Sequence, residues 1–202
     1  MFLVRPPYLV RLFFNRFLWR YKENNNIYLT FDDGPVPEVT PFVLEALKKY
    51  NAKATFFCVG ENAEKHSDLI NRILAEGHLI GNHSFNHLNG WKTSSKIYVE
   101  NIRKCGNIIR SKLFRPPYGK ITPRQSHMLR DYKIIMWDVL SGDYNEKMSE
   151  EACFRNIKRY ARKGSIIVFH DSIKAKKNLF AVLPRVLDHL SHEGYSFVTI
   201  PE

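Results

Sequence analysis

Short apolar runs that alternate with helical segments constrain the fold more than any other feature. The runs of β-type residues lie near 27–31, 54–59, 79–81, 113–114, 133–136, 165–169 and 196–200. The segments between them carry helix start and stop signals, and the predicted helices span about 40–50, 67–77, 94–110, 122–130, 149–164 and 178–193. Strands joined through helices pair in parallel by right-handed crossovers. The sequence therefore predicts an α/β fold.

The number of units narrows this prediction. Seven strand–helix units in the roughly 175 residues that follow residue 26 are compact for a full barrel of eight units. We expect a distorted or incomplete (β/α) barrel of about seven parallel strands, and an open doubly wound sheet is the alternative. Hydrophobic residues make up 44% of the 202 residues and charged residues 25%, which argues against intrinsic disorder.

Residues 1–25 form a separate basic and apolar segment ahead of the domain predicted at 26–202. Its apolar residues are interrupted by Arg5, Arg11, Arg16 and Arg20, so neither a membrane-spanning helix nor a secretory signal is visible. We therefore expect a cytoplasmic or peripheral-membrane location. The apolar residues nevertheless recur at near-helical spacing, at Leu9, Leu12, Phe13, Phe17 and Leu18. Within 1–22 they predict a helix that packs on the main domain or lies on an anionic membrane or wall surface.

The net charge of +11, from 31 Lys and Arg against 20 Asp and Glu, favours an anionic partner without identifying it. Zinc-finger spacing, aromatic–basic RNA motifs and bipartite basic runs are all absent from the sequence, so we expect no nucleic-acid partner. The lysines at 174, 176 and 177 are predicted to form a solvated loop. Three cysteines without a CxxC pair are expected to be reduced core residues, at Cys58, Cys105 and Cys153.

Unusual polar residues follow the predicted strands where each strand ends. They are Asp32, Asp33, His83, His87, Arg115, Asp138, Asp143, His170 and Asp171. Ligand chemistry in α/β folds gathers at the carboxyl ends of parallel strands, so these side chains are predicted to converge on one face. The other histidines lie in helices or connections and are expected to be structural or solvated, at His66, His78, His127, His189 and His192.

The residue types suggest metal-dependent chemistry. Two histidines four residues apart, His83 and His87, are expected to share one face of a helical turn. Together with a carboxylate they form a familiar catalytic zinc set. Arg115, beside two prolines, is predicted to orient a carboxylate through a bidentate contact.

These residues fall into motifs that resemble the polysaccharide deacetylases, the NodB-homology domain of carbohydrate esterase family four. The resemblance covers about residues 26–200. Its motifs, in chain order, are Thr30-Phe31-Asp32-Asp33-Gly34-Pro35, His83-Ser84-Phe85-Asn86-His87, Arg115-Pro116-Pro117-Tyr118-Gly119, Asp143-Tyr144 and Val168-Phe169-His170.

The resemblance implies a role for each motif residue. Asp33, His83 and His87 would bind a divalent metal, with zinc expected. Asp32 would be the catalytic base, and Arg115 would hold it. His170 would be the general acid, positioned by Asp143. The Tyr118 backbone N–H would bind the oxyanion. Tyr144 and Val168 would line the pocket for the acetyl methyl group, where many members have Trp and Leu.

The implied activity is hydrolytic removal of acetyl groups from N-acetylated sugars of a GlcNAc-containing glycan, such as peptidoglycan or chitin-like oligomers. O-acetyl polysaccharide esterase activity at the same site is one alternative. A catalytically silent carbohydrate- or metal-binding module is another, although such a module has no need for both a base and an acid. The sequence leaves the polymer and the oligomeric state open.

Overall fold

The computed structural model describes residues 3–21 and 25–202 and contains one curled parallel sheet. Its strand order is β5-β4-β3-β2-β1-β7-β6, and β8 pairs with β1 beside this path. The strands are β1 (Asn26–Asp32), β2 (Ala54–Cys58), β3 (Leu79–Asn82), β4 (Leu113–Phe114), β5 (Lys133–Ile134), β6 (Val139–Leu140), β7 (Ile166–His170) and β8 (Ser196–Phe197). Every pairing between these strands is parallel, so the predicted incomplete (β/α) barrel is confirmed.

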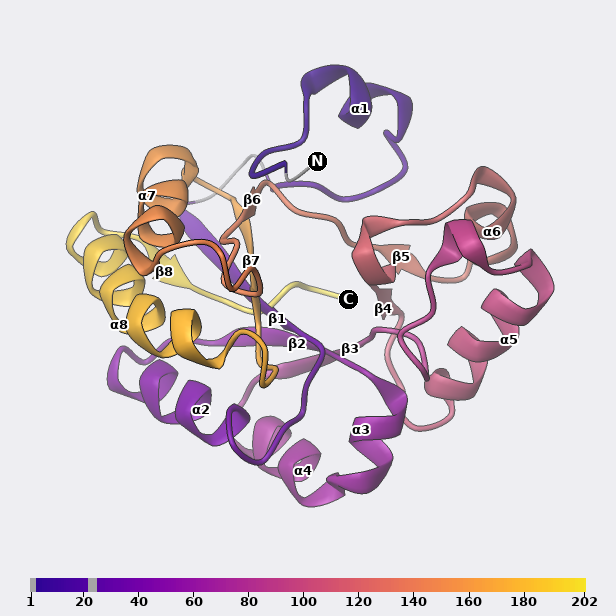
Figure 1. Cartoon of the computed structure of the whole chain (residues 1–202), viewed down its shortest axis with the longest axis horizontal. Helices are drawn as coiled ribbons and strands as arrows, with labels where there is room; N and C mark the ends of the chain where they lie inside the picture. The colour runs from indigo at the N-terminus through magenta and orange to yellow at the C-terminus, as the bar shows by residue number, and fades with distance from the viewer. Residues whose placement is uncertain (1–2, 22–24) are drawn as a thin grey trace.

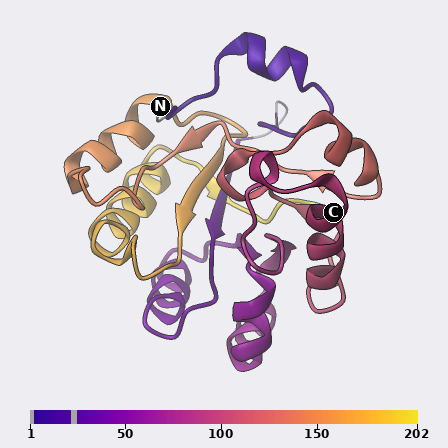
Figure 2. The same ribbon diagram turned by 45° about the vertical axis from the view of Figure 1, so that its right-hand side comes forward.

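Helices surround this sheet, and one short helix stands apart from them (Figures 1 and 2). The surrounding helices are α2 (Thr40–Lys49), α3 (Gly60–Lys65), α4 (Ser67–Ala75), α5 (Ser95–Gly106), α6 (Pro123–Met128), α7 (Glu150–Tyr160) and α8 (Lys176–His192). Two 3₁₀ turns, η1 (Gly90–Lys92) and η2 (Pro117–Gly119), lie in the connections. The separate helix is α1 (Tyr8–Phe13), at the top of Figure 1.

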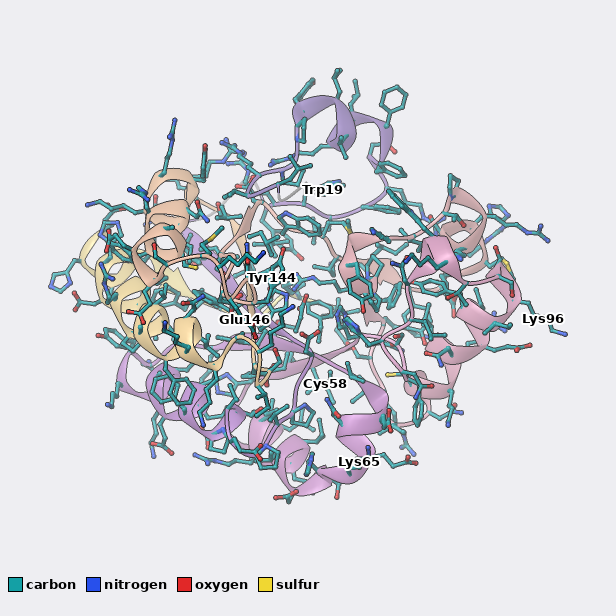
Figure 3. All side chains as sticks on the ribbon, in the orientation of Figure 1. Trp19, Cys58, Lys65, Lys96, Tyr144 and Glu146 are labelled. Atoms are coloured by element: carbon teal, nitrogen blue, oxygen red, sulfur yellow. The ribbon has the colours of Figure 1, made fainter. Side chains whose placement is uncertain are left out.

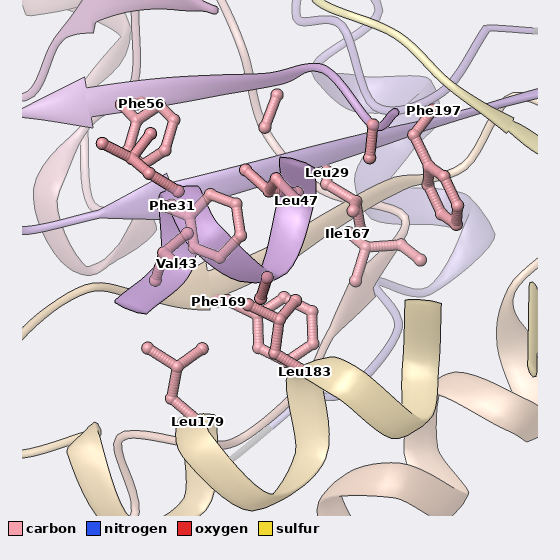
Figure 4. Packing of buried hydrophobic residues seen from close by; sticks show 14 of the residues in the cluster. Leu29, Phe31, Val43, Leu47, Phe56, Ile167, Phe169, Leu179, Leu183 and Phe197 are labelled. Atoms are coloured by element: carbon pink, nitrogen blue, oxygen red, sulfur yellow. The ribbon is translucent and has the colours of Figure 1, made fainter. Parts of the chain in front are cut away.

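Alternation along β1 decides which side chains face the helices. The odd-numbered Ile27, Leu29 and Phe31 belong to the main hydrophobic core, which Figure 4 shows between the sheet and the helices. The even-numbered Thr30 and Asp32 point to the opposite face, where both receive hydrogen bonds from Arg115. The same strand therefore contributes to the core on one face and to a polar site on the other.

Aromatic stacking fixes the central strands against one another. The Phe31 ring stacks on Phe56 of β2, with 5.0 Å between centroids, and on Phe169 of β7, with 5.9 Å. Leu179 and Leu183 of α8 belong to the same core (Figure 4). Full burial of each such side chain stabilises the fold by about 1.5–3 kcal/mol. The three cysteines are buried and free, as predicted.

The inner face of the sheet distinguishes a barrel from a doubly wound sheet. Strand side chains fill it together with residues from the terminal segments, in a cluster of Tyr28, Phe57, Leu113, Ile135, Ile166 and Ile200, with Leu18 and Tyr21 packed against it. A doubly wound sheet instead covers both faces with helices. The alternative of an open doubly wound sheet is therefore wrong.

Some predicted elements differ from the structure. Helix α3 and strand β6 were not predicted, because the first offers little apolar periodicity and the second has only two residues. Helix α7 ends at Tyr160, four residues before the predicted stop at Gly164. The predicted strand at 196–200 shortens to β8, although the Val198 N–H still donates to the Ile27 carbonyl.

The predicted N-terminal helix is shorter than its apolar spacing suggests. Helix α1 ends at Phe13, and the chain then passes alongside the barrel, where Leu18 bridges to Ile135 and Arg20 to Ser165. Phe17 and Trp19 are buried against the domain. Residues 1–2 and 22–24 of this predicted segment lie outside the described residues. Among the helices that the structure describes, none is long and apolar enough to cross a bilayer.

Candidate active site

A cavity of about 470 Å³ opens at the carboxyl ends of the strands and collects most of the predicted site residues. The residues that line it are Asp32, Asp33, His83, His87, Arg115, Pro116, Tyr118, Gly119, Trp137, Leu140, Tyr144, Val168, His170, Ser172 and Lys174. Of the residues to which the resemblance gives a role, Asp143 alone lies behind this lining, in contact with His170. Residues from β1, β3, β4, β6 and β7 thus meet in one place, as the strand-end positions predicted.

Asp33, His83 and His87 form a cluster suited to a metal ion. One ligand atom from each lies within 4.8 Å of the other two. The Nε2 atoms of His83 and His87 lie 3.6 Å and 3.1 Å from Oδ1 of Asp33. Two imidazole nitrogens and one carboxylate oxygen are the donor set of many catalytic zinc sites.

The hydrogen bond at Nδ1 of His83 shows whether a cation would fit between Nε2 of this residue and Asp33. Its Nδ1 lies 2.8 Å from the carbonyl oxygen of Arg115, which can only accept, so Nδ1 carries the proton. Burial lowers the pKa of His83 to about 4, so the ring is neutral and Nε2 is an acceptor. An acceptor nitrogen therefore faces a carboxylate oxygen across 3.6 Å, and a cation between them would satisfy both. The residues fit a divalent metal.

The charge of Asp33 fits the same interpretation. Burial opposes its ionisation, but the hydrogen bond with His87 and the surrounding imidazoles hold the pKa of Asp33 well below its usual range. On the other side of the cluster, Nδ1 of His87 lies 3.2 Å from the Tyr118 hydroxyl. This contact leaves Nε2 of His87 facing Asp33, as metal ligation requires.

The two histidines converge without a helix. The expectation of a helical turn at 83–87 is wrong, because this segment is irregular and Ser84 and His87 adopt left-handed backbone conformations, with φ of 62° and 55°. Ser84 is held there by its N–H, which donates to the Asn82 side chain. Asp33 also has a positive φ, of 81°. Irregular backbone with left-handed residues, rather than one helix face, brings the donors together.

Arg115 is buried and holds Asp32. Its Nη1 donates to Oδ1 of Asp32 at 2.6 Å and to the Thr30 hydroxyl at 2.7 Å. Its Nε and Nη2 donate to the carbonyls of Ile135 and Met136. The predicted bidentate contact is therefore wrong, because the other guanidinium donors serve backbone carbonyls. This arrangement fixes one oxygen of Asp32 and leaves Oδ2 without a contact to the arginine.

His170 is oriented by a buried carboxylate. Its Nδ1 lies 2.8 Å from Oδ1 of Asp143, and its backbone N–H donates to Oδ2 of the same residue at 2.7 Å. Ser141 and the Tyr144 N–H also donate to Asp143. Burial opposes protonation of His170, but Asp143 outweighs it and raises the pKa of His170 to about 9. The ring is therefore a cation near neutral pH, with Nε2 left for another partner.

Tyr144 and Val168 line the same cavity as His170 and Tyr118. The rings of Tyr144 and His170 meet edge to face, with centroids 4.7 Å apart. Tyr144 comes from the loop after β6, and Figure 3 labels it within the sheet-end region of the molecule. Tyr118 adopts a positive φ of 59° in η2, between Pro117 and Gly119.

Asp138 and Asp171 face away from the cavity, contrary to expectation. Asp138 contacts three arginines, Arg5, Arg11 and Arg162, from other parts of the chain. Asp171 accepts hydrogen bonds from the Gly34 N–H and the Thr40 hydroxyl, and so it supports the turn that carries Asp33. Both residues lie next to cavity-lining residues in the sequence, but these partners hold their side chains outside the cavity.

A family model described as Polysaccharide deacetylase matches residues 20–137, more than half of the chain. The chain belongs to the polysaccharide deacetylase family. The match includes the Asp33–His83–His87 cluster and the Asp32–Arg115 pair, while the segments that carry Asp143 and His170 lie beyond it.

Relatives and solved structures agree with this family assignment. Two Bacillus cereus peptidoglycan-N-acetylglucosamine deacetylases are 36% and 34% identical over 87% and 91% of this chain. The chain spans 66% of the first relative's length and 91% of the second's. The crystal structure of the Bc1960 peptidoglycan N-acetylglucosamine deacetylase, in complex with 4-naphthalen-1-yl-N-oxidanyl-benzamide, superposes with a TM-score of 0.89 at 32% identity. That alignment covers 97% of this chain and 95% of the other.

Several cavity residues of this family member were missed at the sequence level. Lys174, predicted to be solvated, lines the cavity together with Ser172 in the loop after β7. Trp137 and Leu140 line it from either end of β6, a strand that was not predicted. Lys174 lies in a polar loop directly after the strand that ends in His170, and this position could have predicted that it lines the cavity.

Proposed function

We propose that this family member hydrolyses the acetamide of N-acetylated sugars in a GlcNAc-containing glycan, such as peptidoglycan or chitin-like oligomers, and releases acetate. The observation that carries the proposal is the grouping of three units around one cavity: the Asp33–His83–His87 cluster, the Asp32–Arg115 pair and the His170–Asp143 pair. A metal-binding module alone would need only the first of these units.

The residues Asp33, His83 and His87 would hold the metal, and zinc suits this donor set. When bound, such an ion supplies a Lewis acid and a means of lowering the pKa of water. Asp32 lines the cavity beside this cluster, and its Oδ2 would accept a proton from the water as the oxygen attacks the acetyl carbonyl carbon. Arg115 fixes the other oxygen and so aims the base.

His170 completes the reaction at the amide nitrogen. Asp143 keeps it protonated near neutral pH, and Nε2 would give that proton to the nitrogen as the carbon–nitrogen bond breaks. An unprotonated amide nitrogen is a poor leaving group, so the acid is as necessary as the base. The Tyr118 backbone N–H would stabilise the negative charge on the carbonyl oxygen during attack.

Tyr144 and Val168 would receive the acetyl methyl group. Both line the cavity next to His170, and both offer apolar surface. A small apolar wall beside the acid suits a methyl group and excludes water from the leaving nitrogen. Trp137 and Leu140 add apolar surface to the same cavity.

Acetate release from defined substrates tests the proposal. We expect release from N-acetylglucosamine oligomers or peptidoglycan by the purified chain supplied with zinc, and loss of release in Asp32→Asn. Release from O-acetylated xylan alone would favour the esterase alternative. The absence of release from every substrate, with zinc bound at the site, would favour a silent binding module.

A further inference from the structure

Helix α1 presents its apolar side chains to solvent and its charged side chain to the protein. The exposed fractions are 77% for Tyr8, 64% for Leu9, 56% for Leu12 and 84% for Phe13. Arg11 points the other way and contacts the buried Asp138 at 2.7 Å. A helix that packs on its own domain shows the opposite arrangement, with its apolar stripe inward. The expectation that Leu9, Leu12 and Phe13 pack on the main domain is therefore wrong.

Contacts with the rest of the protein hold α1 so that its apolar face points to solvent. Arg11 also donates from Nε to the Pro6 carbonyl, and the Leu140 N–H donates to the Val4 carbonyl, so the chain before α1 is tied to β6. After α1, Trp19 donates from its ring N–H to the Phe14 carbonyl. Figures 1 and 3 show α1 raised from the rest of the molecule with side chains directed outward, and Trp19 below it.

The surroundings of α1 are basic. A second cavity, of about 620 Å³, lies beside the helix and is lined in part by Arg5, Arg11 and Arg162, which share the single carboxylate of Asp138. Residues 1–22 contain five basic and no acidic residues, and so does the stretch 155–163. An exposed apolar face with an excess of basic residues around it is complementary to an anionic partner that has an apolar interior.

We propose that α1, together with the basic segments around it, forms a docking site for an anionic phospholipid bilayer. Leu9, Leu12 and Phe13 enter the boundary between headgroups and acyl chains, and the excess positive charge of the segments around α1 attracts the anionic headgroups. A second copy of this chain is a poorer occupant, because pairing the two faces would bring like charges together. A wall polyanion would match the positive charge but leave the apolar side chains in water.

Vesicle binding by the full chain tests this proposal. We expect sedimentation with vesicles that contain phosphatidylglycerol, weaker binding at higher salt, and little binding to vesicles of phosphatidylcholine alone. The double variant Leu12→Ser with Phe13→Ser should bind at least about tenfold more weakly. The matched control Leu74→Ser with Ile97→Ser, which changes two exposed apolar residues on α4 and α5, should bind as the wild type does.

Two further measurements separate insertion from other outcomes. Phe13→Trp should show a blue shift of fluorescence on phosphatidylglycerol vesicles that Ile97→Trp does not show. Deacetylation of soluble oligomers should be unchanged in the double variant, because Leu12 and Phe13 are exposed and lie outside the cavity lining. Equal binding by wild type and double variant would overturn the proposal. So would a concentration-dependent dimer that the double variant abolishes, or binding to anionic wall polymer in place of vesicles.

Discussion

Asp32 of β1 and His170 of β7 are register partners in the parallel sheet. Adjacent strands lie about 4.8 Å apart, so the two side chains leave the sheet as neighbours on the same face. Arg115 holds the first and Asp143 the second. The sheet itself therefore sets the spacing between the proposed base and acid, and the segments after the strands contribute Asp33, His83 and His87 around them.

Asp32→Asn tests the base directly. The amide keeps the size of the carboxylate and can still accept a hydrogen bond from Arg115, so we expect a folded chain with the thermal unfolding midpoint close to that of the wild type. Because the amide cannot take a proton from water, acetate release should fall by about 10²–10⁴-fold. Unchanged release would remove Asp32 from the mechanism.

The pKa of His170 predicts the alkaline side of the pH profile. The acid must be protonated, so kcat/KM should fall as the pH rises through about 9. In Asp143→Asn the charge that supports protonation is lost, and the fall should move to about pH 6.5 or below. The measurement is kcat/KM on N-acetylglucosamine oligomers between pH 5 and pH 10 for both chains. A profile that Asp143→Asn leaves in place would argue against His170 as the acid.

The raised pKa of His170 also makes the free energy of unfolding depend on pH. The pKa of His170 is higher in the folded chain than the ordinary 6.5, so the folded state binds the proton more tightly. This contribution to the free energy of unfolding is fully present below about pH 6.5 and is lost as the pH rises through about 9. Urea unfolding of the wild type should show this decline, and Asp143→Asn should show less of it.

Metal removal tests the cluster of Asp33, His83 and His87. A chelator should abolish acetate release, and added zinc should restore it. His87→Ala should bind zinc at least about tenfold more weakly in calorimetric titration, since one of three protein ligands is lost. His192→Ala is the matched control, because this exposed histidine on α8 lies far along the chain from the cluster and contacts Asp188. Full activity in the presence of the chelator would contradict a metal-dependent mechanism.

The convergence of the site could be predicted because it depends on strand ends. Parallel strands separated by helices place their carboxyl ends on one edge, so Asp32, His83, Arg115 and His170 could be grouped without coordinates. Their detailed contacts could not be predicted. The turn that orients His83 and His87 depends on left-handed residues that no helix spacing describes.

The side-chain direction of Asp138 also could not be predicted from the sequence. Trp137 and Asp138 are neighbours directly before a two-residue strand, yet Trp137 lines the cavity and Asp138 contacts the arginines. A strand this short carries no pattern from which the phase can be inferred. The partners that hold Asp138, Arg5 and Arg11, lie more than 120 residues earlier in the sequence. Only the folded chain brings them together.

Trp19 links the N-terminal segment to the cavity wall, and Trp19→Ala tests that link. Its ring is buried and meets the edge of Trp137, which lines the cavity, with centroids 6.3 Å apart. Truncation of a buried tryptophan should lower the free energy of unfolding by about 3–5 kcal/mol.

The effect on catalysis separates this support role from simple loss of stability. In Trp19→Ala, Trp137 would lose the ring that packs against it, while the sheet still holds Asp32 and His170 in place. KM for oligomers should therefore rise more than kcat falls. Trp91→Ala is the control, since that tryptophan is 67% exposed and lies outside the cavity lining, and Trp19→Phe should restore part of the affinity. If Trp19→Ala destabilises the fold but leaves KM unchanged, then the N-terminal segment supports the barrel without shaping the substrate wall.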